Sequence, residues 1–113
     1  FVQGAGWLGC EEVNWRSNGQ ITTHSPSTYK IPAVNDMPEK FNAEIFKKGK
    51  NIENVINKSK TTGEPPLMNA MSVFFAIKNA IASIGNYTVN PNLDAPATPE
   101  KILMSIKNLK NKI

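Results

Sequence analysis

The chain has 113 residues, of which 40% are hydrophobic, and a formal net charge of +4. This length is that of one domain, at roughly 100 to 200 residues per domain, and it excludes two independent catalytic domains. The hydrophobic share excludes a chain that is disordered throughout.

The basic residues do not form the dense, arginine-containing patch that nucleic-acid binding usually requires. Arg16 is the only arginine, and the lysines are spread over the second half of the chain. No apolar run approaches the roughly 20 residues that span a membrane. We therefore expect neither a nucleic acid nor a membrane as a partner. Because the chain begins at Phe1 inside an apolar pattern, we expect it to be processed or to be a piece of a longer protein.

One cysteine and one histidine exclude a disulfide framework and an iron–sulfur or zinc site built by this chain alone. A single cysteine fits a reducing compartment. Cys10 is followed by Glu11 and Glu12, so it lacks the positive neighbours that activate a thiol. The two adjacent carboxylates point in different directions on a helix. No acidic residue is placed to orient His24, which we interpret as a turn residue, and we predict no metal ligands.

The first segment, residues 1–13, has the spacing of a short helix. Its apolar residues recur at near-helical intervals: Val2, Ala5 and Leu8. Three glycines leave positions without a side chain, where another surface could come close: Gly4, Gly6 and Gly9. They follow no predicted strand and lack the spacing of a dinucleotide-binding loop, so we interpret them as packing glycines.

The middle of the chain combines predicted β-structure with long irregular connections. An Asn-Gly pair between two β-prone runs predicts a hairpin over residues 13–23. Three prolines favour an irregular excursion over 24–38. Alternating apolar and polar residues predict a half-buried strand over 41–46, and 47–60 is typical of a polar connection.

The longest predicted element is a helix from Pro65-Pro66 to about Ile84, with Gly85 as its C-terminal cap. Apolar residues cover nearly its whole circumference, so we expect it to be buried nearly all round. A hairpin, a strand and two other helices are too few to enclose it. The sequence therefore predicts either an oligomer or missing parts of a larger domain.

A last helix has a full set of start signals, with Thr98 as N-cap, Pro99 at the first helical position and Glu100 in the first turn. One apolar face and lysines near its end make this helix amphipathic. Together the elements predict an α+β fold. In it, the short hairpin and the strand pack with a buried central helix and the amphipathic C-terminal helix.

The segment before the long helix carries the strongest candidate for chemistry. Gly63 permits a positive φ or a close backbone approach, and Pro65 and Pro66 stiffen the turn that holds Glu64. A general base requires such a rigid support. A first-turn carboxylate that complements the helix dipole explains the same spacing, and the dipole opposes the raised pKa that a base requires. The spacing leaves both interpretations open.

Four segments and a closing segment resemble, in order, the C-terminal end of the molybdopterin-binding subunit of the xanthine dehydrogenase and aldehyde oxidase family. They are Phe1 to Trp7, Ser27 to Ala33, Ser59 to Leu67, Ser72 to Lys78 and Asp94 to Glu100. The Gly-Glu-Pro-Pro and Tyr-Lys-Ile-Pro motifs in register make the resemblance specific. It implies that residues 1–113 are a C-terminal fragment of a molybdopterin-binding domain.

The resemblance implies a molybdenum hydroxylase that oxidises xanthine or hypoxanthine with oxygen from water. It implies molybdopterin as cofactor, with iron–sulfur clusters and FAD on other domains or subunits that pass electrons to NAD. In this family the glutamate of the Gly-Glu-Pro-Pro motif, here Glu64, is the catalytic general base. The implied enzyme is cytoplasmic, and its partners are the remainder of the molybdopterin-binding subunit, the Fe-S/FAD subunit and the purine substrate.

Thr61-Thr62 replaces the Ala-Val that is common in the family, so the substrate preference stays open. An aldehyde or N-heterocycle hydroxylase is the alternative within the same chemistry. A non-catalytic module that oligomerises through the helix over 67–84 is the alternative of another class. The family's other cofactor-contacting segments lie outside the 113 residues, so we predict that the isolated chain binds no molybdopterin and is inactive.

Overall fold

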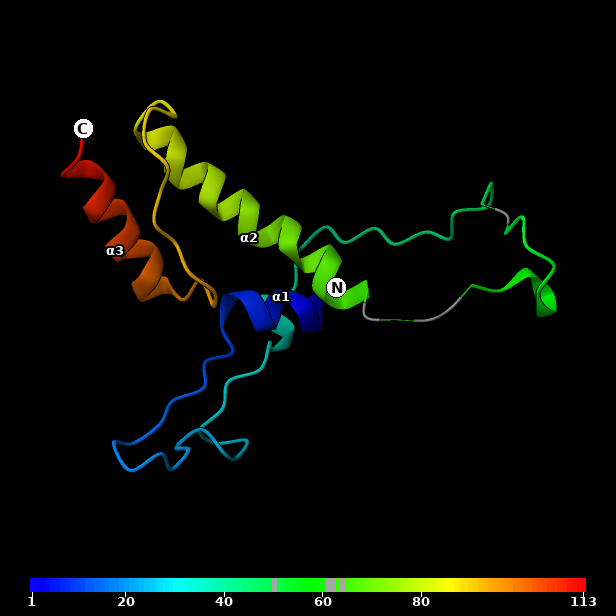
Figure 1. The fold of residues 1–113 in the computed structure, drawn as a ribbon, viewed down its shortest axis with the longest axis horizontal. Coiled ribbons are helices and arrows are strands. Elements are labelled where there is room, and N and C mark those ends of the chain that lie inside the picture. The colour runs from blue at the N-terminus through cyan, green and yellow to red at the C-terminus, as the bar shows by residue number, and fades with distance from the viewer. Residues whose placement is uncertain (50, 61–62, 64) are drawn as a thin grey trace.

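The computed structural model describes residues 1–49, 51–60, 63 and 65–113, and of Pro65 and Pro66 only the backbone. In this part of the chain the regular elements are α1 (Val2–Gly9), α2 (Pro65–Ile84), α3 (Pro99–Lys110) and two 3₁₀ turns at Val34–Asp36 and Ile56–Lys58 (Figure 1). All three predicted helices are confirmed, and the long one has the predicted bounds.

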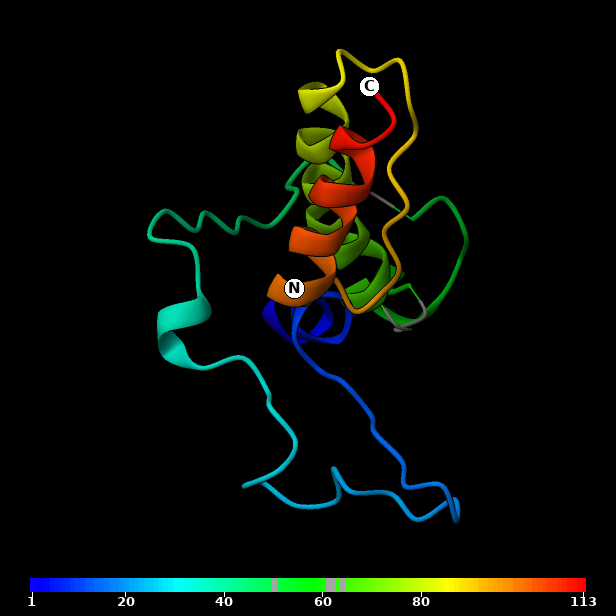
Figure 2. The ribbon, with the colours of Figure 1, turned by 90° about the vertical axis from the view of Figure 1, so that its left-hand side faces the viewer.

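The core lies between α2 and α3. These helices lie side by side and run in the same direction, because the extended chain between them returns along the pair (Figures 1 and 2). The buried core residues are Ile81, Leu93, Ala97 and Leu109, and Phe74, Ile77, Val89, Ile102 and Ile106 pack against them. Full burial of one such large aliphatic side chain contributes about 1.5–3 kcal/mol. This shared core therefore holds α3, and the extended segment 85–98 that connects the two helices, against α2.

The end of α2 differs from the prediction in the role of Gly85. The residues with positive φ are the next two, Asn86 at 49° and Tyr87 at 61°. Gly85 is buried, and a Cβ on it would lie 3.4 Å from Ile113 and 3.7 Å from Leu109. The glycine therefore allows the end of α3 to approach α2 closely, whereas the left-handed turn is made by the residues that follow.

The start of α3 confirms the predicted signals. The Thr98 hydroxyl accepts a hydrogen bond from the Lys101 backbone N–H at 3.4 Å. Pro99 opens the helix, Glu100 lies in its first turn, and two lysines lie in its last turn. These charges complement the partial positive and negative ends of the helix dipole.

Helix α1 packs across the first half of α2 (Figures 1 and 2). Gly4 and Gly6 are its buried residues, and Ala70 of α2 is completely buried. Small residues let two helix backbones approach closely, which agrees with the interpretation of these glycines as packing residues.

The predicted hairpin is confirmed in its shortest form. One isolated antiparallel bridge joins Trp15 to Ile21, and the Arg16 N–H donates to the Gln20 carbonyl at 2.9 Å. Gly19 has a φ of 81°, which is the backbone conformation that an Asn-Gly turn requires.

The predicted strand over 41–46 is wrong for this structure, since these residues have no regular structure. Phe41, Ile45 and Phe46 are 45%, 87% and 77% exposed. A strand requires a neighbouring strand to satisfy its backbone groups, and none lies beside it in the described residues. The α+β class therefore remains a prediction about a larger domain.

Much of α2 is not covered by the rest of the chain. Only 11% of its window Leu67–Ile84 is buried, and Met68 and Phe75 are 65% and 58% exposed. The burial predicted for this helix would therefore have to come from protein outside the 113 residues or from a second copy. With a mean hydropathy of 1.4, the same window is long and apolar enough to cross a membrane, contrary to our expectation from the sequence. The core helix of a soluble protein meets the same criterion of length and composition.

Two long irregular excursions, residues 10–33 and the described residues of 38–49 and 51–60, leave the helices in different directions (Figures 1 and 2). The radius of gyration is 18.5 Å, whereas a compact chain of this length has one of roughly 13 Å. The helices form a local unit, and the excursions return to it at a few contacts, such as Pro32 on Gly6 and the ring of Phe41 beside that of Phe1.

Candidate functional site

The best-defined polar site lies where the first excursion returns to α1. There the ring of Pro32 packs directly on Gly6, and a Cβ on Gly6 would overlap that ring. The same Cβ would lie 2.7 Å from Oε1 of Glu11. Gly6 is therefore required for a close approach between α1 and the returning chain.

A hydrogen bond between Tyr29 and Glu11 fastens the returning chain beside this contact. The Tyr29 hydroxyl donates to Oε2 of Glu11 at 2.5 Å, and Glu11 is only 9% exposed. The hydrogen bond to Glu11 raises the pKa of the Tyr29 hydroxyl above its ordinary value of 10.0, because it stabilises the protonated phenol. Two residues that are distant in sequence thus form one partly buried polar contact.

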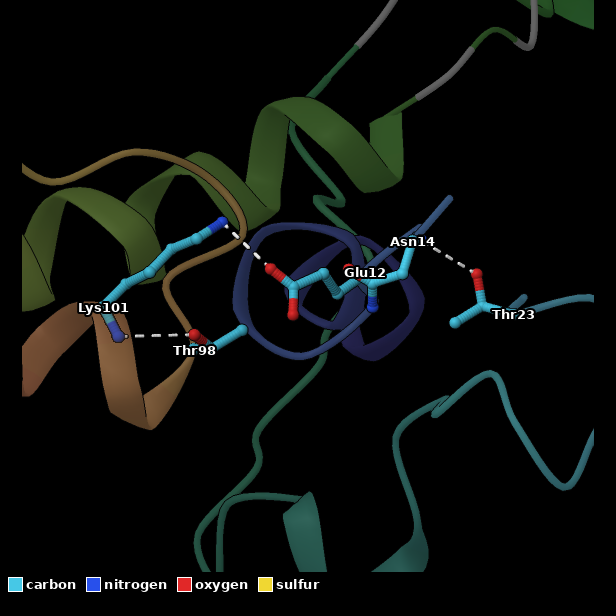
Figure 3. A network of polar contacts seen from close by, with 5 residues as sticks. All are labelled: Glu12, Asn14, Thr23, Thr98 and Lys101. Carbon is cyan, nitrogen blue, oxygen red and sulfur yellow. Dashed lines mark hydrogen bonds and ion pairs between the residues drawn. The ribbon is translucent and has the colours of Figure 1, made fainter. Parts of the chain in front are cut away.

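Helix α1 is also tied to the start of α3, as Figure 3 shows. The carboxylate of Glu12 lies 3.3 Å from the Lys101 Nζ, and the Ala97 N–H donates to the Leu8 carbonyl at 2.6 Å. The side chain of Thr98 caps the helix that carries Lys101. Glu11 and Glu12 therefore contact different parts of the structure, as their adjacency predicts.

Asn14 and Thr23 hold the base of the hairpin, next along the chain (Figure 3). The Asn14 N–H donates to the Thr23 hydroxyl at 3.1 Å. This bond brings the two ends of the excursion's first loop together close to α1.

His24 lines an open pocket with a volume of about 610 Å³, next to the base of the hairpin. The residues that line it are Val13, Ile21, Thr23, His24, Ser25, Pro26, Tyr29 and Ile31. None of them is acidic, and His24 is exposed. The interpretation of His24 as a turn or surface residue agrees with this position, since nothing there orients the imidazole as a base.

Cys10 is half-buried at the end of α1. Burial raises the pKa of its thiol, and the charge of Lys30 only partly opposes this shift. A raised pKa means less thiolate near neutrality, which agrees with the interpretation of Cys10 as an unactivated thiol.

Glu64, the predicted catalytic residue, lies outside the described residues, as do Thr61 and Thr62. Its described neighbour Gly63 is exposed, and no described atom would lie within 4 Å of a Cβ on it. The base assignment of Glu64 remains a prediction.

Comparison with known proteins adds the decisive observation. Residues 1–38 match the family model of the molybdopterin cofactor-binding domain. The chain is 42% identical over 93% of its length to xanthine dehydrogenase 2 of Arabidopsis thaliana. It is 44% identical over 90% of its length to the xanthine dehydrogenase/oxidase of Felis catus. The chain belongs to the xanthine dehydrogenase family. It spans 8% of the length of each of these relatives.

The segment matched to the cofactor-binding family contains α1 and both of its contacts with the returning chain. No group of three His, Cys, Asp or Glu side chains in the described chain could hold a metal. The one buried side-chain atom without a partner there is the Ser105 hydroxyl of α3, and the space beside Gly6 is filled by Pro32. Within the described residues, the contacts of this segment are contacts between elements of the chain.

The partners of Glu11 and Glu12 were not predicted from the sequence. Tyr29 belongs to the Tyr-Lys-Ile-Pro motif, but its spacing from Glu11 follows the path of the excursion and no local period. For Lys101 the sequence indicates only a place on an amphipathic helix. Tertiary contacts of this kind have no signal in a single sequence.

Gly6→Ala is expected to lower the free energy of unfolding of the chain by about 1–3 kcal/mol, because the new methyl group overlaps Pro32. Gly9→Ala is the matched control in the same helix, since nothing lies within 4 Å of a Cβ there. It is expected to be neutral or to stabilise by up to about 1 kcal/mol through helix propensity. Thermal unfolding followed by circular dichroism measures both. Equal effects of the two variants would contradict the close contact.

Tyr29→Phe is expected to lower the melting temperature below pH 10, because Glu11 loses its donor. A pKa raised in the folded state stabilises below the unfolded value, and this contribution is lost as the pH rises through the folded value. The difference from the unsubstituted chain should therefore begin to shrink above pH 10 and disappear once the pH exceeds the raised pKa of Tyr29. Tyr87→Phe, which removes a 63% exposed tyrosine's hydroxyl, is the control. A difference that does not depend on pH would contradict the assigned hydrogen bond.

Proposed function

We propose that residues 1–113 are part of the molybdopterin-binding region of an enzyme that hydroxylates xanthine or hypoxanthine with oxygen from water. The observation that supports this best is the 42–45% identity to xanthine dehydrogenases over at least 90% of the chain. Electrons would leave through iron–sulfur clusters and FAD, on other domains or subunits, to NAD. The enzyme would be cytoplasmic, and its partners would be the remainder of the molybdopterin-binding subunit, the Fe-S/FAD subunit and the purine.

We assign the general base of the reaction to Glu64. In the sequence it immediately precedes Pro65, where a helix of 20 residues begins. A long helix that packs against α1 and α3 is a rigid support, and a base needs a fixed position relative to the proton that it removes. Burial or a nearby negative group in the intact enzyme would raise the pKa of Glu64, whereas the helix dipole lowers it.

The contacts around α1 would hold the cofactor-binding segment in place. The Gly6–Pro32 and Glu11–Tyr29 contacts close its excursion, and the Glu12–Lys101 pair ties it to α3. Because the chain spans 8% of the length of its relatives, the groups that hold molybdopterin would come mostly from the rest of the protein.

The alternatives differ in substrate or in class. An aldehyde or N-heterocycle hydroxylase would use the same base, and the ratio of kcat/KM for xanthine to kcat/KM for an aldehyde would identify it. A non-catalytic oligomerising module is favoured by the exposed apolar residues of α2, such as Met68 and Phe75. Cofactor-free, inactive full-length protein would support that alternative.

Glu64→Gln in the full-length enzyme is expected to lower kcat by roughly 10²–10⁴-fold, which is the usual contribution of a general base. Molybdenum content should stay the same, because the variant keeps the size of the side chain. The control is Glu53→Gln, which neutralises an exposed carboxylate in the second excursion and should leave turnover unchanged. Unchanged turnover of the Glu64→Gln enzyme with cofactor bound would refute the assignment.

The isolated 113-residue chain is expected to contain no molybdenum and to reduce no electron acceptor in the presence of xanthine. The physical reason is that the chain spans 8% of the length of its relatives, so most of the groups that would hold the cofactor lie outside it. Metal analysis and an acceptor-reduction assay on the purified chain test this. Purine-dependent turnover with bound molybdenum would overturn it.

A further inference from the structure

A second cavity lies on α1, on the side of the returning chain. Its volume is about 390 Å³, and its lining residues are Val2, Gln3, Trp7, Glu11, Ile31 and Pro32. The walls are mostly apolar, with one indole, one amide and one carboxylate. The carboxylate belongs to Glu11, which is 9% exposed.

In the described part of the chain, only one of the two carboxylate oxygens of Glu11 accepts a hydrogen bond. Oε2 accepts from the Tyr29 hydroxyl, whereas no described donor reaches Oε1. Among the described cations, Lys30 lies 3.9 Å from Asp36, Lys101 lies 3.3 Å from Glu12, and none pairs with Glu11. Oε1 keeps access to solvent, because the Ser105 hydroxyl is the one fully buried described side-chain atom without a partner. A carboxylate that is covered by further protein without a cation is costly, so such groups are normally paired.

The walls of the cavity favour one kind of cation. A guanidinium group is planar and weakly hydrated, it stacks on an indole, and it donates to a carboxylate. An ammonium group is a compact, strongly hydrated charge that would lose more hydration between Val2, Ile31 and Pro32. Trp7 provides the aromatic surface and Glu11 the acceptor on the same cavity.

We propose that this cavity receives the guanidinium of an arginine from the part of the protein outside these 113 residues. The guanidinium stacks on Trp7 and donates to Oε1 of Glu11, while Tyr29 holds the other oxygen. The chain spans 8% of its relatives, so the larger protein has ample sequence to supply this side chain. The site is an intramolecular anchor, and it does not depend on the assigned activity.

The first experiment uses arginine modification by phenylglyoxal in the full-length protein, read by mass spectrometry. One arginine should be protected in the unsubstituted protein and react severalfold faster in Glu11→Gln, which keeps the shape of the side chain and removes its charge. Glu12→Gln is the matched control, because Glu12 is the adjacent residue and pairs with Lys101 outside this cavity. The same modification pattern in all three proteins would overturn the proposal.

A second measurement tests the proposal even if the Glu11→Gln variant fails to fold. A crystal structure of the unsubstituted full-length protein should place a guanidinium against Trp7 within hydrogen-bond distance of Oε1. A lysine, a backbone N–H, water or an apolar side chain at that position would overturn the proposal. Both results are independent of Glu64 and of turnover, so failure here and failure of the proposed function are distinguishable.

Discussion

The structure depends on α2, a helix of 20 residues that is apolar nearly all round. Both other helices pack against it, α1 on its first half and α3 beside its second half. Burying apolar surface is the main favourable contribution to folding, and no other described element offers such a surface. The arrangement of the three helices therefore follows from which parts of α2 are covered by α1 and by α3.

Glycine and proline decide how closely the segments approach. Gly6 lets the ring of Pro32 lie directly on α1, and Gly85 lets the end of α3 approach the end of α2. In both places the lack of a side chain permits the close contact. The glycine is not required there for its backbone conformation, because neither residue has a positive φ. Hydrogen bonds and one ion pair then fix these approaches: Tyr29 with Glu11, Ala97 with Leu8 and Lys101 with Glu12.

The exposed apolar residues and the extended excursions have one common explanation. The chain spans 8% of the xanthine dehydrogenases that it resembles, and it has a radius of gyration well above that of a compact domain. Ile45 and Phe46 are largely exposed on an excursion that touches little else. We infer that these surfaces pack against protein outside the 113 residues.

The sequence by itself determined the elements whose signals are local. The Pro-Pro start of α2, the Thr98 cap of α3, the Asn-Gly turn and the glycine-thinned α1 are all present, because capping, turn chemistry and helical period act within a few residues. Family membership was also predictable, because its motifs are short and in register. Only the tertiary structure decided that Glu11 meets Tyr29 and that Glu12 meets Lys101, since these partners depend on the path of an irregular excursion and on the packing of α3. The alternation over 41–46 did not produce a strand for the same reason: a strand depends on a neighbour, and no pattern within the segment can supply one.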